Sequence, residues 1–189
     1  MKKPALLIID MQNDFVCEGA PLRVEGADLI TSNIREVLDM FRKKQLPIFH
    51  VVRVHRGDGS DVEIFRHDLF RKLPFAVEGT KGAEIIPELG PRKGEYIIRK
   101  TRMSAFLFTE LDLILRTMGC DPLFVTGIQT PNCIRTTVFD ACALNYSVYL
   151  VEDAVAAKNQ DIHRFNCLDM AAIGVGMIRT SEVSRMLSS

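Results

Sequence analysis

The sequence lacks a hydrophobic run long enough to cross a membrane, and it lacks an excess of charge of either sign. No apolar stretch approaches the roughly 20 residues that a bilayer-spanning helix requires. Lys and Arg together number 24, as do Asp and Glu, so the formal net charge is zero. A neutral chain has no global field that would attract nucleic acid or an anionic membrane surface. We therefore expect a protein that binds neither nucleic acid nor membranes.

Paired cysteines are also missing. The five cysteines are odd in number, and no two of them have the C-x-x-C spacing of a zinc or redox motif. Free thiols are typical of a reducing compartment, so we expect a cytoplasmic protein. The first residues and the apolar run after them resemble a signal peptide. That run is too short and Asp10 follows it directly, so we interpret it as a strand.

Short apolar runs alternate with helical patterns along the chain. The expected strands cover 5–9, 47–54, 96–99, 123–127, 147–151 and 175–178, and the expected helices cover 28–45, 104–118, 132–145 and 161–173. This alternation, with strands that are apolar throughout, is typical of a parallel sheet covered by helices on both faces. We predict one α/β domain over residues 1–189, a three-layer α/β/α sandwich. Its six-stranded parallel sheet is expected to have the order 3-2-1-4-5-6.

Residues 55–93 form too long a stretch for a structureless connector. Phe65, Phe70 and Phe75 argue against disorder, because aromatic side chains are depleted in disordered segments. We expect a short helix or two that fold over the functional site as a lid. A flexible insertion is the alternative.

The expected strand order places two reactive residues at one edge of the sheet. Strands one and four are neighbours in this order, and ligands bind outside the carboxyl ends of the strands at that point. Asp10 follows the first strand, and Cys133 follows the fourth at the expected start of a helix. A helix N-terminus carries unpaired N–H groups and a partial positive charge, which favour thiolate over thiol. Cys133 is therefore the candidate nucleophile.

Two charged residues could assist this thiol, because a thiolate nucleophile needs a proton acceptor and a compensating positive charge. Asp10, partly desolvated at the tip of a buried strand, is the candidate base; otherwise it caps the next turn. Lys100 ends the third strand, about 10 Å from the first. Its ammonium could lie between the carboxylate and the thiol, although a solvated surface lysine is the commoner case.

The four histidines indicate a weaker site. None of them lies near Cys133 in the expected elements, so a Cys-His-Asp triad has little support. A metal site built from His55, Asp58, Asp61 and His67 is conceivable, but their spacing matches no helical face or known metal motif. We therefore expect neither a metal nor a cofactor.

Three segments resemble the isochorismatase-like cysteine hydrolases, a family that includes nicotinamidase, N-carbamoylsarcosine amidohydrolase and ureidoacrylate amidohydrolase. The segments are Ala5–Phe15 (ALLIIDMQNDF), Lys100–Phe106 (KTRMSAF) and Val125–Cys133 (VTGIQTPNC). Further similarity at 79–85 and 151–154 spreads the resemblance over nearly the whole chain, in the order typical of the family.

The resemblance implies a catalytic triad of Asp10, Lys100 and Cys133. It also implies a cis peptide bond at Ile128–Gln129 and an oxyanion hole formed by the N–H groups of Gln129 and Cys133. Such an enzyme attacks a carboxamide or carbamoyl carbon, forms a thioester and releases ammonia. Relatives are commonly dimers or tetramers, so a homodimer or homotetramer is expected.

The sequence departs from the nicotinamidases after the second strand. Those enzymes carry an Asp-x-His metal motif, whereas Arg53-Val54-His55 places a cation where they have a carboxylate. A metal-anchored pyridine substrate is therefore not expected. Arg53 or Arg102 could pair with an anionic group of the substrate, or both could pair with loop carboxylates. The further candidates for the pocket wall, which flank the catalytic segments, are Phe15, Phe65, Gln129 and Asn132.

Three functions are compatible with these features. The leading hypothesis is a metal-independent cysteine amidohydrolase acting on a small carboxamide or carbamoyl compound. The second is acid–base hydrolysis of isochorismate or a similar vinyl ether, with Cys133 as a bystander. The third is a catalytically silent relative that binds a small molecule. The isochorismatases proper lack the cysteine, so Cys133 favours the first hypothesis.

Overall fold

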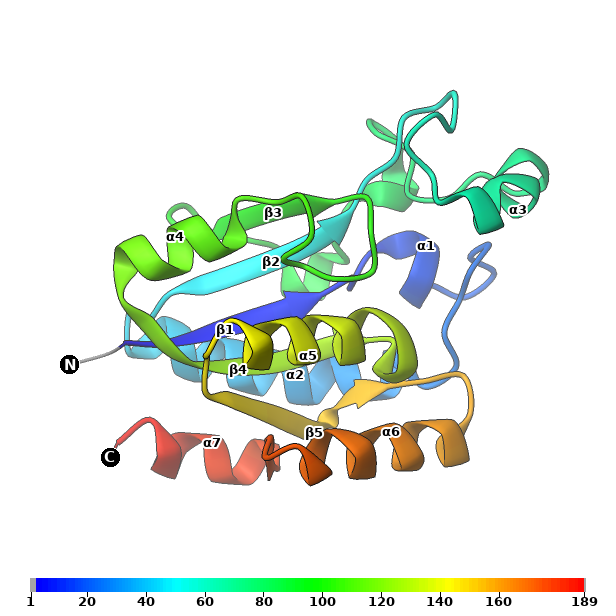
Figure 1. The fold of residues 1–189 in the computed structure, drawn as a ribbon. Coiled ribbons are helices and arrows are strands. Elements are labelled where there is room, and N and C mark those ends of the chain that lie inside the picture. The colour runs from blue at the N-terminus through cyan, green and yellow to red at the C-terminus, as the bar shows by residue number, and fades with distance from the viewer. Residues whose placement is uncertain (1–2, 189) are drawn as a thin grey trace.

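The computed structural model describes residues 3–188, which are built around one six-stranded sheet (Figure 1). Neighbouring strands are parallel throughout, in the order β3-β2-β1-β4-β5-β6. The strands are β1 (Lys3–Ile9), β2 (Ile48–Arg53), β3 (Tyr96–Lys100), β4 (Cys120–Ile128), β5 (Val148–Ala156) and β6 (Gly176–Ile178). The predicted strand order is confirmed.

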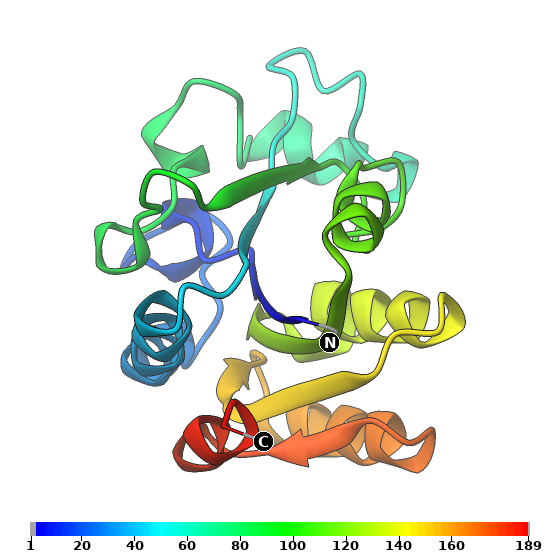
Figure 2. The same cartoon turned by 90° about the vertical axis from the view of Figure 1, so that its left-hand side faces the viewer.

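Helices cover both faces of this sheet. They are α1 (Asn13–Val16), α2 (Ala27–Lys43), α3 (His67–Lys72), α4 (Leu111–Met118), α5 (Arg135–Ala143), α6 (Gln160–Ala172) and α7 (Thr180–Met186). Figure 2 shows α2 and α7 on one side of the sheet and α4, α5 and α6 on the other. The predicted three-layer sandwich is thus confirmed. No helix within residues 3–188 is long and apolar enough to cross a bilayer.

The central strands contribute to two separate cores, because successive side chains of a strand point to opposite faces. In β1, Leu6 and Ile8 join the core beneath α2, whereas Leu7 and Ile9 join the core beneath α4 and α5. Burial on both faces explains why the strands are continuous apolar runs rather than alternating ones.

The helix predicted over residues 104–118 begins only at Leu111. Phe108 has a positive φ of 60° and is 84% exposed, so it neither continues a right-handed helix nor packs in the core. The Ser104 hydroxyl accepts a hydrogen bond from the Phe106 N–H at 3.1 Å. Such local bonds between side chain and backbone compete with helix formation. Helix α7 was not predicted; its buried Val183 joins the core on the α2 face.

The segment between β2 and β3 contains the expected short helix, α3, and three 3-10 turns. These turns are η1 (Ile64–Arg66), η2 (Lys81–Ala83) and η3 (Pro87–Leu89). Phe70 and Phe75 are buried with their ring centroids 5.4 Å apart. The Asp14 carboxylate accepts a hydrogen bond from the Ala76 N–H at 2.7 Å. The segment is therefore fastened to the residues that follow β1.

Glu95 connects the start of β3 to both α2 and β2. Its carboxylate accepts hydrogen bonds of 2.7 and 3.0 Å from the Arg42 guanidinium and lies 2.8 Å from His50 Nε2. Burial acts to raise the pKa of Glu95, but hydrogen bonds from Arg42, the Arg92 N–H and His50 together lower this pKa to about 2. Because β3 ends in Lys100, this cluster helps to fix the strand that carries that lysine.

We expect Glu95→Gln to lower the free energy of unfolding at pH 7 by up to about 3 kcal/mol, as follows from the depressed pKa of Glu95. Because the pKa of Glu95 is lower in the folded than in the unfolded state, its charge stabilises the fold at pH values above the unfolded pKa, near 4.5. This stabilisation is lost as the pH falls towards 2. Urea denaturation of both proteins at pH 7 and pH 3 measures the effect, with the exposed Glu88→Gln as control. The difference should fall below half at pH 3; an undiminished difference would contradict this account.

Candidate active site

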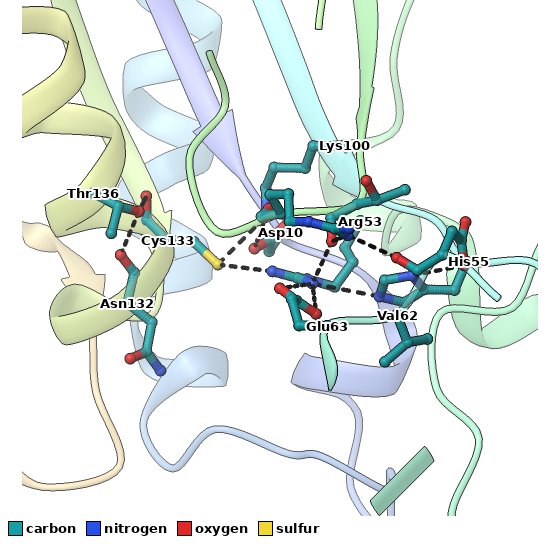
Figure 3. Close-up of polar contacts among 12 residues, drawn as sticks. Asp10, Arg53, His55, Val62, Glu63, Lys100, Asn132, Cys133 and Thr136 are labelled. Atoms are coloured by element: carbon teal, nitrogen blue, oxygen red, sulfur yellow. Dashed lines mark hydrogen bonds and ion pairs between the residues drawn. The ribbon is translucent and has the colours of Figure 1, made fainter. Parts of the chain in front are cut away.

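Asp10, Lys100 and Cys133 meet at the carboxyl edge of the sheet, as Figure 3 shows. Lys100 Nζ lies 2.9 Å from Asp10 Oδ2 and 3.3 Å from Cys133 Sγ. The three residues are buried, with exposed fractions of 4%, 2% and 6% respectively. The structure therefore brings together the carboxylate, ammonium and thiol that the sequence analysis singled out.

The ends of β1 and β4 approach each other unusually closely. Gly127, in β4, has a φ of 109°, and a Cβ added there would lie 2.1 Å from the carbonyl oxygen of Ile9. Only glycine is compatible with both this conformation and this contact. Asp10, directly after Ile9, has a left-handed φ of 56° and donates its N–H to the Val51 carbonyl at 2.9 Å. This geometry turns the chain after β1 beside the segment that carries Cys133.

Cys133 lies on a turn of π-helix, Thr130–Ile134, which precedes α5. π-Helical turns occur frequently at functional sites. The peptide bond between Ile128 and Gln129, just before this turn, is cis. The helix predicted from residue 132 therefore begins as a π-turn, and its α-helical part starts at Arg135.

The environment of Cys133 raises the pKa of its thiol. Burial is the largest cause, and the negative charge of Asp10 acts in the same direction, whereas Lys100 and Arg53 oppose them. Burial thus outweighs the positive charges of Lys100 and Arg53, and the contribution of the helix N-terminus stays a prediction. A buried thiol of this kind needs a base. Asp10 Oδ1 is buried and has no N–H or O–H donor in residues 3–188, so it is free to accept a proton.

Arg53, at the end of β2, supplies a second cation next to the thiol. Its Nη2 lies 3.9 Å from Cys133 Sγ. Its Nη1 donates to both carboxylate oxygens of Glu63, at 2.9 and 3.1 Å, and to the Thr101 carbonyl at 3.1 Å. The Gln12 side chain bonds both the N–H and the C=O of Arg53, at 2.8 and 2.7 Å. These contacts fix Nη1 of the guanidinium and leave Nη2 directed at the sulfur.

A cavity of about 180 Å³ opens onto Cys133. Of the residues predicted for its wall, Phe15, Arg53, Gln129 and Asn132 line it. Phe65 does not, because its side chain is 71% exposed outside the cavity, contrary to the prediction. A wider groove of about 640 Å³ runs beside α6, but none of the three residues of the candidate site borders it.

Arg102 also lies outside the cavity. Its guanidinium donates to the carbonyl oxygens of Asp61 and Thr101, at 2.7 and 3.1 Å. Within residues 3–188 it pairs with no loop carboxylate, contrary to one alternative, and its pairing with a substrate anion stays a prediction. Arg53 does pair with a loop carboxylate, that of Glu63.

Several lining residues were not predicted. They are Leu22, Val24, Arg66, Leu69 and Lys158. Glu63, which orients Arg53, was missed as well. A buried arginine requires a counter-charge, so Arg53 predicts a carboxylate nearby. However, the sequence offers several carboxylates in residues 55–93 and no pattern that selects one.

The residues considered for a metal site do not assemble. His55 Nδ1 lies 3.3 Å from Asp61 Oδ1, but His67 Nε2 lies 2.9 Å from the Val62 carbonyl and Asp58 bonds the Ser60 hydroxyl. In the described part of the chain, no three His, Cys, Asp or Glu side chains are grouped to hold a metal ion. The other ring nitrogen of His55, Nε2, lies 3.3 Å from Arg53 Nη1.

Comparison with known proteins identifies the family. A family model described as "Isochorismatase domain" matches residues 4–182. The chain is 45% identical to a protein of Arabidopsis thaliana named "Probable inactive nicotinamidase", over 99% of this chain and 97% of that protein. It is 28% identical to the N-carbamoylsarcosine amidase of an Arthrobacter species, over 89% of this chain and 65% of that enzyme.

A crystal structure of an isochorismatase family protein from Desulfovibrio vulgaris has the same fold, with a TM-score of 0.95 and 45% identity over 100% of both chains. Sequence and structure thus agree over nearly the full length, and the chain belongs to the isochorismatase family of hydrolases.

Proposed function

We propose that the protein is a metal-independent cysteine hydrolase that cleaves the C–N bond of a small carboxamide or carbamoyl compound. The observation that carries this proposal is the contact of Lys100 Nζ with both Asp10 Oδ2 and Cys133 Sγ beside a small cavity. The similarity to an N-carbamoylsarcosine amidase supports C–N bond cleavage as the reaction.

In the first half of the reaction, Asp10 accepts the proton of the Cys133 thiol, and the sulfur attacks the carbonyl carbon of the substrate. Lys100 and Arg53 stabilise the thiolate as it forms. The N–H groups of Gln129 and Cys133 stabilise the oxyanion of the tetrahedral intermediate. Asp10 then returns the proton to the leaving nitrogen, the C–N bond breaks, and ammonia departs from a thioester.

In the second half, a water molecule attacks the thioester carbon while the Asp10 carboxylate accepts its proton. The C–S bond breaks, and the sulfur leaves as a thiolate that recovers the proton from Asp10. The sum of the two halves is amide plus water giving acid plus ammonia, and the enzyme returns to its starting protonation state. Burial of Asp10 and Cys133 keeps bulk water away from this exchange.

Arg53 has a specific part in this scheme. Burial alone would leave the thiol very difficult to deprotonate, and Asp10 must remain an anion to act as base. The buried guanidinium of Arg53 favours the anionic form of both groups. It takes no part in the proton transfer between Cys133 and Asp10, since a guanidinium does not deprotonate in proteins. Arg53 thus provides fixed positive charge at the side of the thiol.

A second candidate function is binding without turnover. It is favoured by the name of the Arabidopsis relative, which calls that protein a probable inactive nicotinamidase. In this case the same cavity would hold a small molecule, and Cys133 would remain unreactive. The reactivity of the thiol distinguishes the two functions.

Cys133→Ala is expected to abolish ammonia release from whichever compound the native protein hydrolyses, because the thioester cannot form. A panel of carboxamides, ureas and carbamates is assayed for ammonia, with isochorismate included as a vinyl ether. Cys142→Ala, which removes a thiol that lies outside the cavity, is the control and should keep full activity. Full turnover by Cys133→Ala would refute the proposal.

Asp10→Asn should separate thiol reactivity from catalysis. Removing the negative charge of Asp10 lowers the pKa of Cys133, so iodoacetamide should alkylate the thiol at lower pH than in the native protein. Turnover should nevertheless fall by about 10²–10⁴-fold, because the general base is lost. Rates of alkylation and of ammonia release are measured on the same preparation. If turnover survives, Asp10 is not the base.

The double variant Arg53→Met/Glu63→Gln should raise the pKa of the Cys133 thiol, since a cation close to the sulfur is removed. Both residues are changed because a buried Glu63 without its partner would destabilise the fold. The iodoacetamide rate is measured between pH 6 and about 11. The exposed pair Arg99 and Glu78, changed in the same way, serves as control; an equal shift in both double variants would argue against the role of Arg53.

A further inference from the structure

The cavity beside Cys133 contains more positive charge than the proposed chemistry uses. Lys100 and Arg53 act on the thiol, but Arg66 and Lys158 also line the cavity. Asp10 is the only carboxylate among the described residues that line it. The two additional cations come from separate segments, one on η1 and the other between β5 and α6. Their convergence is therefore not a consequence of one local turn.

Arg66 is held in an unfavourable position for an arginine. It is half-buried, and its guanidinium has no carboxylate within 4.0 Å in residues 3–188. Burial lowers its pKa, and the charge of nearby Arg53 lowers it further, although Glu63 acts in the opposite direction. A desolvated cation beside a like charge costs free energy unless an anion compensates it. Within residues 3–188, no carboxylate forms an ion pair with Arg66, and the nearby Glu63 is already paired with Arg53.

A purely structural explanation for Arg66 is its contact with Phe65. The guanidinium carbon lies 5.4 Å from the centroid of that ring. Phe65 is 71% exposed, however, so this contact needs no approach of the arginine to the cavity. The contact explains which way part of the side chain lies, but not why the cation borders the space in front of Cys133.

We propose that Arg66, assisted by Lys158, binds a carboxylate group of the substrate, so that the substrate is a short amide or carbamoyl acid. A guanidinium binds a carboxylate through two parallel hydrogen bonds, which would orient the substrate as well as hold it. The cavity of about 180 Å³ corresponds to roughly six water molecules, which suits a compound of this size. This inference rests on the proposed function, because it concerns the same cavity.

The test uses two reagents of the same size that differ in charge. Iodoacetate carries a carboxylate where iodoacetamide carries a neutral amide, and both alkylate the Cys133 sulfur. The ratio of their rate constants cancels any change in the reactivity of the thiol itself. In Arg66→Gln this ratio should fall about fivefold or more, as expected for loss of one charge near 4 Å. Lys158→Gln should lower the ratio less, because this residue is exposed.

Arg71→Gln is the matched control. Arg71 lies on α3, is exposed and pairs with Asp68 outside the cavity, so its ratio should equal that of the native protein. The melting temperature of Arg66→Gln should stay the same or rise, since an uncompensated cation is removed. A lower melting temperature with an unchanged ratio would assign Arg66 a structural role and overturn the proposal.

The outcomes separate this inference from the proposed function. Labelling of Cys133 by both reagents with the same ratio in native protein and Arg66→Gln would overturn the carboxylate site and leave the nucleophile in place. Absence of labelling by either reagent in the native protein would overturn both. Once a substrate is found, Arg66→Gln should raise KM for the amide acid at least fivefold while leaving KM for its neutral methyl ester unchanged.

Discussion

The ion pair between Lys100 and Asp10 is the interaction on which the site depends. Two opposite charges at 2.9 Å, both buried, are costly to desolvate, and their attraction offsets this cost only when the geometry is fixed. The sheet fixes it from both sides: β3 is paired in register with β2, with Arg53 opposite Lys100, and β1 is pressed against β4 at Gly127. The thiol is placed against this pair by the π-turn after β4. Displacement of any of these strands would separate the two charges, and an unpaired charge in a buried site costs free energy.

The thiol itself is controlled by opposing effects. Burial and Asp10 disfavour the thiolate, whereas Lys100 and Arg53 favour it, and the net direction is towards the protonated form. Under the proposed function, the resting nucleophile is thus neutral and becomes charged only when Asp10 takes its proton. Arg53 also lies beside His55, where its positive charge would repel a metal cation.

Much of this was predictable from the sequence, and the remainder was not, for physical reasons. Strands buried on both faces give unbroken apolar runs, so the strands followed from local patterns. Their order was assumed to be the usual one for this class of fold, and it placed Asp10, Lys100 and Cys133 at one edge of the sheet. The start of α4 was wrong because a single hydrogen bond of Ser104 competes with the helix, which periodicity does not register. Glu63, Arg66 and Lys158 were missed because they lie outside the strands and α-helices, where no repeat relates sequence position to the direction of a side chain. The raised pKa of the Cys133 thiol was not predicted because its largest cause is burial, which a sequence does not measure.

The turn η1 has a consequence for how relatives of this protein diverge. It holds Arg66, and Glu63 directly precedes it, so a few adjacent positions bear on both the reactivity of the sulfur and the space in front of it. This stretch lies outside the sheet, in the connection between β2 and β3. Connections of this kind vary more in length and sequence than the strands they join. Under the proposed binding role of Arg66, substitutions or insertions there would alter which compound is accepted while Asp10, Lys100 and Cys133 keep their places. The family's spread of substrates then needs no redesign of its framework.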